Sequence, residues 1–159
     1  MENPQIREAS VYDFESLHEL YSHVDQNHND AHPEQFKPSY EIKRPDAYLE
    51  KLLNDGNIKL LVACVESQVV GFIHAELSEI SHPVLYSYLY GHISDVVVHP
   101  KFKRIGVGRI LFQAVEQWLI EKGAKEIGLT VFSFNKEAIS FYRNNGFTNR
   151  NCKMVKSLA

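Results

Sequence analysis

Two glycines and several basic residues follow an apolar run near the middle of the chain, an arrangement suited to binding an anion. The run is Val96–Val98, and the glycines are Gly106 and Gly108. The first backbone N–H groups of a helix have no partner inside the helix and lie at the positive end of its dipole. A glycine there lets the backbone approach a phosphate without an intervening Cβ, so a helix beginning at Gly106 would form a phosphate site. The basic side chains that would add positive charge to it are Lys101, Lys103, Arg104 and Arg109.

The same residues exclude two common phosphate-binding motifs. A P-loop requires Gly-Lys followed by Ser or Thr, whereas Gly108 is followed by Arg109. A dinucleotide-binding fold places its glycines after the first strand, and here several predicted strands precede them. Because a lone Gly-x-Gly can also be an ordinary helix start on a basic surface, the interpretation depends on a second motif.

That second motif lies in the last third of the chain: Asn135-Lys-Glu-Ala138-Ile-Ser-Phe141-Tyr142-Arg-Asn-Asn-Gly146-Phe147. It is similar to the N-x-x-A-x-x-F/L-Y-x-x-x-G-F motif of the GNAT superfamily of N-acetyltransferases. Lys103-Arg-Ile-Gly-Val-Gly108 resembles the family's Q/R-x-x-G-x-G/A pyrophosphate loop, and Val96-Val-Val-His-Pro100 its apolar fourth strand with the proline that follows. Lys103 departs from the pattern, because lysine keeps a positive charge but lacks the planar fork of arginine. The resemblance covers about residues 58–157.

The resemblance implies one α/β domain over residues 1–159, with a mixed, mostly antiparallel, twisted sheet of six to seven strands flanked by about four helices. Acceptor-side helices and a loop would occupy about residues 13–55, and a cofactor-binding core about residues 91–147. The implied cosubstrate is acetyl-coenzyme A (acetyl-CoA), held along a fourth strand that splays from the fifth, and no metal is expected. The cofactor-binding positions carried over are Val96, Val97, Val98, Lys103, Arg104, Ile105, Gly106, Val107, Gly108, Arg109, Asn135 and Tyr142.

Acetyl transfer to an amine also needs an acid for the leaving thiolate and a base for the attacking ammonium. By the resemblance, Tyr142 is the general acid near the coenzyme sulfur; the alternative is a core aromatic side chain. Asn135 would serve as a helix N-cap, a cofactor contact or both.

The predicted base is His92, because histidine titrates close to neutral pH. An ordinary hydrogen-bonded sheet histidine is the alternative, and Ser94, Asp95 and Glu76 are further candidates near the same cleft. Strand alternation places His92, Ser94 and Val96 on one face and Asp95 on the other, unless a bulge intervenes.

Hydrophobic periodicity and turn residues predict the elements that position these residues. The segment 25–39 is predicted to be an irregular loop, and in the family this region covers the acceptor pocket, where its acidic residues would suit a cationic amine. Strands are expected over 5–9, 58–65, 69–77, 86–90, 91–98, 127–132 and 153–155, and helices over 14–24, from 45 to about 54, 106–122 and 135–145.

Length and composition limit the class of protein. The 159 residues, 44% hydrophobic and 23% charged, suffice for one folded domain. A formal net charge of −3 argues against a nucleic-acid partner. The longest apolar run, Leu60–Val65, is too short to span a membrane, and two cysteines without metal spacing suit a reduced compartment. We therefore expect a cytoplasmic protein that binds neither nucleic acid nor membrane.

The expected reaction is direct transfer of an acetyl group to a primary amine in a ternary complex, because neither Cys64 nor Cys152 falls within the motifs. The acceptor is a small molecule or a peptide, with polyamines, aminoglycosides, amino acids and protein amines all open. A homodimer is the first alternative to a monomer, since dimers are the commonest oligomers. The competing functions are a non-catalytic acyl-CoA sensor and a nucleotide-binding module of another α/β family.

Overall fold

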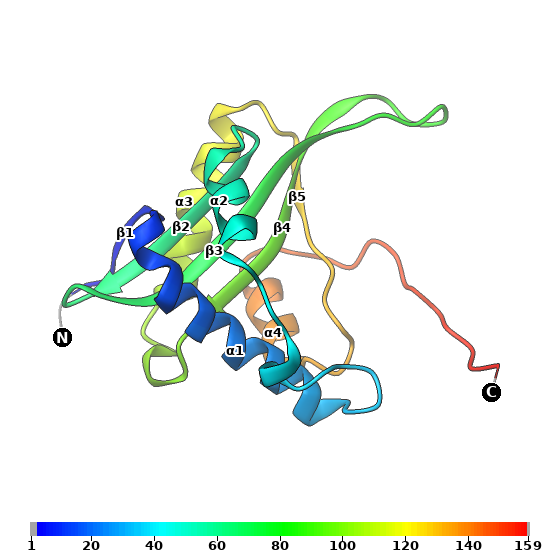
Figure 1. The fold of residues 1–159 in the computed structure, drawn as a ribbon. Coiled ribbons are helices and arrows are strands. Elements are labelled where there is room, and N and C mark those ends of the chain that lie inside the picture. Colours follow the sequence, from blue (N-terminus) through cyan, green and yellow to red (C-terminus); the bar gives the residue numbers. More distant parts are fainter. Residues whose placement is uncertain (1–2, 159) are drawn as a thin grey trace. The chain divides into compact units, whose positions relative to one another are not determined.

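The computed structural model describes residues 3–158, which divide into two compact units, one ending at Leu129 and the other beginning at Thr130 (Figure 1). The first unit holds a sheet in the order β1-β2-β3-β4-β5, antiparallel throughout except that β4 and β5 are parallel. The strands are β1 Gln5–Glu8, β2 Ile58–Val65, β3 Gln68–Ile80, β4 Tyr88–Val98 and β5 Glu126–Gly128. The mixed, mostly antiparallel sheet is confirmed.

The described residues form five strands rather than six or seven, for local reasons. The segments predicted on either side of Gly91 join into the single strand β4, because Gly91 does not interrupt the strand. Its missing side chain instead makes room for a helix, since a Cβ there would lie 2.4 Å from Cδ1 of Leu119. The strand predicted over 127–132 ends at Gly128, and the one predicted over 153–155 is absent, with Met154 and Val155 almost fully exposed.

Helices cover both faces of this sheet (Figure 1). α1 (Phe14–Ala31) and α2 (Asp46–Asn54) pack on one face, and α3 (Val107–Glu121) contacts β2, β3 and β4 on the other. Three short 3₁₀ helices, Val11–Asp13, Ser39–Glu41 and Pro100–Phe102, join these elements. The buried residues of the α1/α2 face are Phe14, Leu17, Leu20, Tyr21, Leu49, Leu52, Leu60, Val62, Phe72 and Val97.

α1 continues to Ala31, so the prediction of an irregular loop from residue 25 is wrong for its first two turns. Polar residues that are poor helix formers on their own find partners here. Gln26 Nε2 donates to Asp30 at 2.7 Å, one turn along the helix, and its Oε1 accepts from Ser39 N–H at 3.1 Å. Asn29 Nδ2 donates to the Phe36 carbonyl at 2.7 Å. Tertiary hydrogen bonds thus stabilise a segment whose intrinsic helix propensity is low.

The second unit contains α4 (Lys136–Asn144). Asn135 Oδ1 accepts from Ala138 N–H at 3.1 Å, which confirms the predicted N-cap. Gly146 follows the helix with φ +88°, the left-handed conformation typical of a helix end. After it, residues 147–158 have no regular secondary structure.

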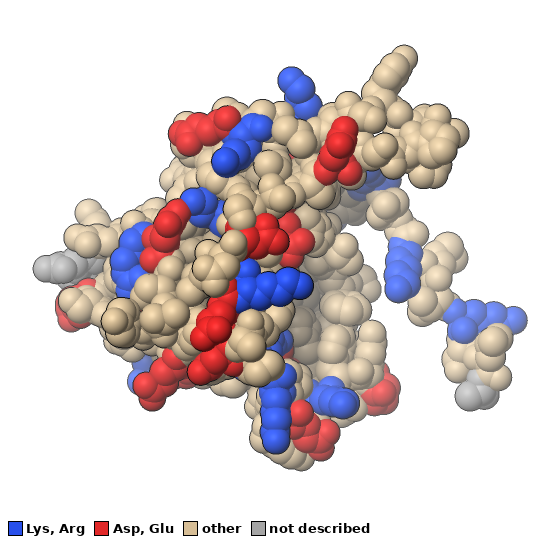
Figure 2. All heavy atoms as spheres, turned by 45° about the horizontal axis from the view of Figure 1, so that its top comes forward, with Lys and Arg blue, Asp and Glu red and all other residues tan. Residues whose placement is uncertain are grey.

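No helix among the described residues is both long and apolar enough to cross a membrane. Figure 2 shows lysine and arginine side chains interspersed with aspartate and glutamate over the face turned to the viewer.

Candidate functional site

β4 loses its neighbour part of the way along its length. β5 pairs only with Tyr90, Gly91 and His92, whereas β3 pairs with β4 as far as Val98. Beyond His92, therefore, one edge of β4 has no strand partner in the sheet of residues 3–129. This is the splayed edge that the resemblance implied.

Val96 and Val98 of β4 direct their backbone groups to this open edge, as the bonds of their neighbours indicate. The His99 N–H donates to the Val70 carbonyl of β3 at 2.8 Å, and the Val97 carbonyl oxygen lies 2.8 Å from where a Gly71 Cβ would be. Successive residues of a strand point their backbone groups to opposite sides. Since Val97 and His99 face β3, Val96 and Val98 face the open edge.

The start of α3 lies beside the end of β4. An added Cβ at Gly71 would meet both Val97 O, at 2.8 Å, and Val107 Cγ1, at 3.2 Å. Glycine at position 71 lets these two elements approach each other. The N-terminus of α3 therefore lies close to the end of β4.

The N-terminus of α3 presents free amides, as predicted. Gly106 is its N-cap with φ +91°, and the helical hydrogen bonds start with Ile110 N–H to Gly106 O, at 3.1 Å. Arg104 also has a positive φ, 64°, so the loop turns tightly ahead of the helix. The amides of Val107 and Gly108 precede the first helical bond and suit an anion.

The side chains of this loop divide into two kinds. Lys103, Arg104 and Arg109 are exposed and able to add positive charge, and Ile105 is exposed as well. Val107 is 2% exposed, so only its backbone is available to a ligand. This chemistry fits the pyrophosphate and pantetheine of acetyl-CoA, which carry phosphate oxygens and amide groups.

A bulge in β4 changes which side chains face α1 and α2. His74 pairs with Asp95 and Ala75 with Ile93, so Ser94 is an extra residue without a counterpart on β3. The strict alternation expected for β4 therefore fails at this point, and the stated exception of a bulge applies. The side chain of Asp95 lies on the α1/α2 face, where its Oδ2 is 3.4 Å from the Tyr21 hydroxyl.

Next to the bulge, β3 contributes His74 and Glu76, which form a cluster with Asp95 on the α1/α2 face. His74 Nε2 lies 3.2 Å from Glu76 Oε1, and its Nδ1 lies 3.6 Å from Asp95 Oδ2. Ser94 Oγ donates to Glu76 Oε1 at 3.2 Å. Sequence reasoning included Glu76 and Asp95 as candidates but missed His74. The available signal was a histidine and a glutamate two residues apart in the otherwise apolar stretch Val69–Leu77.

A half-buried ion pair between Arg44, which precedes α2, and Asp25 of α1 lies near this cluster. Arg44 donates from both terminal nitrogens to Asp25 of α1, one of these bonds being 3.0 Å, and its guanidinium lies 4.0 Å from the centre of the Tyr21 ring. Burial, and then the charge of Asp95, raise the pKa of Tyr21 above its usual range. The same two causes raise the pKa of Tyr48 on α2. Both tyrosines therefore stay protonated at neutral pH and can donate hydrogen bonds.

The predicted base, His92, sits opposite Glu76 in the sheet and is half-buried, with its ring 6.5 Å from that of Tyr90. The structure thus brings His92 together with Glu76. Tyr142 and Asn135 belong to the second unit, where Tyr142 contacts Phe141 and Phe147. Their contacts with the cofactor remain predictions.

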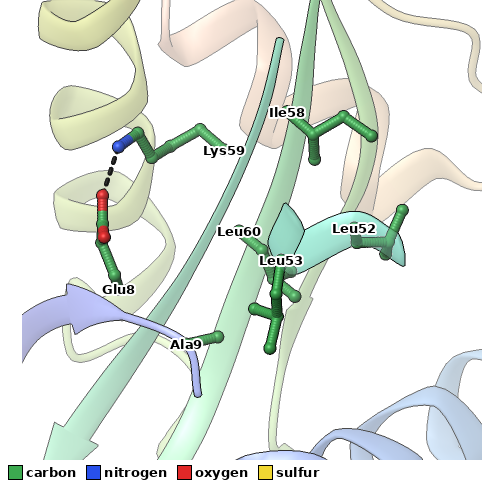
Figure 3. A pocket seen from close by; sticks show the side chains of 7 residues that line it. All are labelled: Glu8, Ala9, Leu52, Leu53, Ile58, Lys59 and Leu60. Carbon is green, nitrogen blue, oxygen red and sulfur yellow. Dashed lines mark hydrogen bonds and ion pairs between the residues drawn. The ribbon is translucent and has the colours of Figure 1, made fainter. Parts of the chain in front are cut away.

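Two other features lie outside this cluster. A pocket of about 60 Å³ is lined by the end of α2 and the start of β2, with an ion pair between Lys59 and Glu8 (Figure 3), and it is too small for a cosubstrate. Glu19, His23 and His99 place three ligand-type atoms within 4.8 Å of one another. Because His99 Nδ1 accepts from Lys101 N–H, the neutral ring carries its proton on Nε2, which then cannot ligate a metal.

Comparison with known proteins agrees with this geometry. The profile of the acetyltransferase (GNAT) family matches residues 16–147. The L-amino acid N-acetyltransferase AaaT of Escherichia coli is 27% identical over 89% of this chain and 81% of its own length. An uncharacterized N-acetyltransferase of Bacillus subtilis, YhfO, is 23% identical over 89% of this chain and 88% of its own.

Solved structures show the same fold. A mutant of the BH1408 protein from Bacillus halodurans superposes with a TM-score of 0.92 at 24% identity, covering 98% of this chain and 99% of that one. The aminoglycoside N-acetyltransferase AAC(6')-Iy in complex with CoA gives a TM-score of 0.74 at 17% identity, covering 98% and 99%. Since the family profile spans most of the chain, this protein belongs to the GNAT family and is an acetyl-CoA-dependent N-acetyltransferase.

Proposed function

We propose that acetyl-CoA binds with its pantetheine arm along the open edge of β4 and its pyrophosphate at the N-terminus of α3. The observation that carries the proposal is the end of β5 at Gly128, which leaves Val96 and Val98 facing an open edge beside free helix amides. Within this site the amides of residues 104–108 hold the pyrophosphate. Lys103 and Arg109 contribute charge from the surface.

Acetyl-CoA supplies the acetyl group as an activated thioester, and the chain supplies position and proton transfer. The Val96 N–H polarises the thioester carbonyl, and Tyr142 gives a proton to the departing sulfur. Transfer is direct within a ternary complex. In support, Cys64 lies within β2 and Cys152 in the irregular C-terminal segment, and neither adjoins the β4 edge in sequence or in sheet pairing.

We propose a small cationic amine as the acceptor. The α1/α2 side of the β4 bulge carries two carboxylates, Glu76 and Asp95, with side chains 45% and 30% exposed. The nearby Arg44 is already paired with Asp25. Partly exposed negative charge attracts an ammonium group. Relatives point the same way: AaaT acts on L-amino acids, and a structural neighbour with a TM-score of 0.69 is an aminoglycoside acetyltransferase in complex with sisomicin.

Calorimetric titration with acetyl-CoA, run beside ATP and NAD, tests the cofactor site. Saturable binding selective for acetyl-CoA is expected, and preference for ATP or NAD would contradict the proposal. A panel of amino acids, polyamines, aminoglycosides and acetyl-acceptor peptides, followed by thiol release, then tests the acceptor class. Turnover confined to peptides would reject a small-molecule acceptor, and retained binding without any turnover would indicate a sensor.

We place the protein in the cytoplasm, where acetyl-CoA is made, and where its two free thiols, Cys64 and Cys152, would stay reduced. A homodimer remains a prediction, which light scattering of the purified chain at several concentrations would test.

A further inference from the structure

One imidazole in the first unit is buried between two carboxylates. His74 is 2% exposed, and both of its ring nitrogens are sealed from solvent. Nε2 faces Glu76 at 3.2 Å and Nδ1 faces Asp95 at 3.6 Å. Neither contact is aligned as a hydrogen bond within the described residues, although buried polar atoms are normally paired.

Between two ionised carboxylates, the neutral imidazole of His74 can accept one further proton. An ionised carboxylate only accepts hydrogen bonds, and a neutral imidazole has a single N–H donor. His74 can therefore satisfy one carboxylate while neutral and both only when protonated. The shorter contact, to Glu76, is the natural place for the proton of the neutral ring. A proton added to Nδ1 would then form a hydrogen bond to Asp95 across the longer contact.

We propose that Asp95 is the general base for the acceptor amine and that His74, held by Glu76, takes up the proton that Asp95 receives. This inference rests on the proposed function, and it replaces His92 as the base. Asp95 follows the β4 bulge directly and precedes Val96. Its carboxylate lies on the α1/α2 face, where we propose that the acceptor binds, next to the Val96 N–H that is proposed to face the thioester. In this arrangement Asp95 is the catalytic residue, and His74 and Glu76 are positioning residues.

The proton balance closes with this assignment. The acceptor arrives as an ammonium, and Asp95 removes one proton, which frees the lone pair of the nitrogen. That pair forms the C–N bond with the acetyl carbon, while the C–S bond breaks and its electrons stay on sulfur. The sulfur gains one proton, for which Tyr142 is the predicted donor, and the second proton that the nitrogen loses as the amide forms returns to the Tyr142 phenolate through solvent. The first proton stays on the Asp95–His74 pair until the product leaves and solvent reaches Asp95 again.

The groups around His74 favour this role. Glu76 would stabilise a protonated ring from β3 and Asp95 from β4, whereas the hydrogen bonds of Arg44 go to Asp25. The Tyr21 hydroxyl of α1 stays protonated and lies 3.4 Å from Asp95, where it orients the carboxylate. On the solvent side, Ser94 and His92 flank Glu76, and Tyr48 lies on α2.

Kinetics of three variants test the proposal. Asp95→Asn should lower kcat/KM by about 10²–10⁴-fold, the range typical of a lost general base. His74→Gln should lower kcat by about tenfold or more and move the acid limb of the pH profile, with the KM for acetyl-CoA unchanged. Glu76→Gln should move that limb to lower pH, because it removes one of the two carboxylates that would stabilise a protonated ring. His82→Gln, an exposed histidine in the β3–β4 turn, is the matched control and should keep the wild-type profile.

A measurement without turnover accompanies the kinetics. In ¹⁵N-histidine spectra, the ring-nitrogen shifts of His74 should change in Asp95→Asn and in Glu76→Gln, because each variant removes one of the two carboxylates that face the ring, and stay unchanged in His82→Gln. Thermal melting checks that each variant folds. If His74→Gln does not fold, the two carboxylate variants still test the proposal.

The outcomes separate the two proposals. A wild-type protein that acetylates amines while His74→Gln and Glu76→Gln retain its pH profile would overturn the relay and leave the function standing. Ring-nitrogen shifts of His74 that neither carboxylate variant changes would also overturn it. A wild-type protein that binds acetyl-CoA and acetylates no amine would instead overturn the function and, with it, the assignment of the base.

Discussion

The phosphate site at the start of α3 is tested most sharply by adding side chains at Gly106. We expect Gly106→Ala to weaken acetyl-CoA binding and Gly106→Glu to abolish it. The residue has φ +91°, and nothing lies within 4 Å of an added Cβ in the protein itself. Any loss of binding beyond the conformational effect must therefore come from the ligand that shares this space.

The structure supports an estimate of each effect. An L-residue in the left-handed region costs about 1–2 kcal/mol of stability, which lowers Tm by about 2–8 °C for a chain of this size. Losing one amide hydrogen bond to a charged pyrophosphate weakens binding by about 1.5–3 kcal/mol, or about 10-fold to 150-fold. A carboxylate about 4 Å from a phosphate charge adds about 4 kcal/mol of repulsion near a protein surface, close to a further 10³-fold.

Gly123→Ala is the matched control because Gly123 ends the same helix with φ +83°, and its added Cβ would make only an ordinary 3.9 Å contact with Leu89. Calorimetry gives the affinity and thermal melting the stability of each variant. Both alanine variants should lose similar stability, and only Gly106→Ala should lose affinity. Affinity within threefold of wild type in Gly106→Glu, or an equal loss in Gly123→Ala, would refute the phosphate site.

Three further predictions concern the acid, the alternative base and the N-terminal ion pair. Tyr142→Phe should lower kcat far more than acetyl-CoA affinity, and steady-state kinetics with an equal kcat would remove Tyr142 as the acid. If His92 rather than Asp95 is the base, His92→Ala should depress kcat/KM most at neutral pH; on our assignment its pH profile keeps the wild-type acid limb, with a loss of less than about tenfold. Asp13 is 4% exposed, and two hydrogen bonds from Arg7, of 2.7 and 2.8 Å, hold its pKa below the usual value. A lowered pKa stabilises the fold above the unfolded value of about 3.9, and this contribution is lost as the pH falls further. Asp13→Asn should therefore cost about 1–2 kcal/mol at neutral pH, a modest amount because the Arg7 side chain is 47% exposed, and urea unfolding of the variant should depend less on pH below about 4.

Local features of this protein could be predicted from its sequence. Asn135 caps α4, and Gly106 opens α3 with free amides, because these interactions join residues within one helical turn. Most elements were located for the same reason, since the period of apolar residues reports which face an element buries. The family motifs added the mixed, mostly antiparallel character of the sheet and the activity.

Other features depended on contacts between distant segments. The extension of α1 to Ala31 depends on partners in residues 36–44, which the helix sequence does not contain. Gly91 remained inside a strand because Leu119 of α3 occupies the space that a side chain would need.

The grouping of Asp95 with His74 and Tyr21 on the α1/α2 face depends on the tertiary structure alone. The bulge at Ser94 is a property of the register between β3 and β4, and it turns Asp95 toward α1. Only that turn brings the carboxylate to His74 and Tyr21, which are 21 and 74 residues away along the chain. A sequence specifies the nature of these groups, whereas their proton chemistry follows from distances that exist only after the sheet has paired and the helices have packed on it.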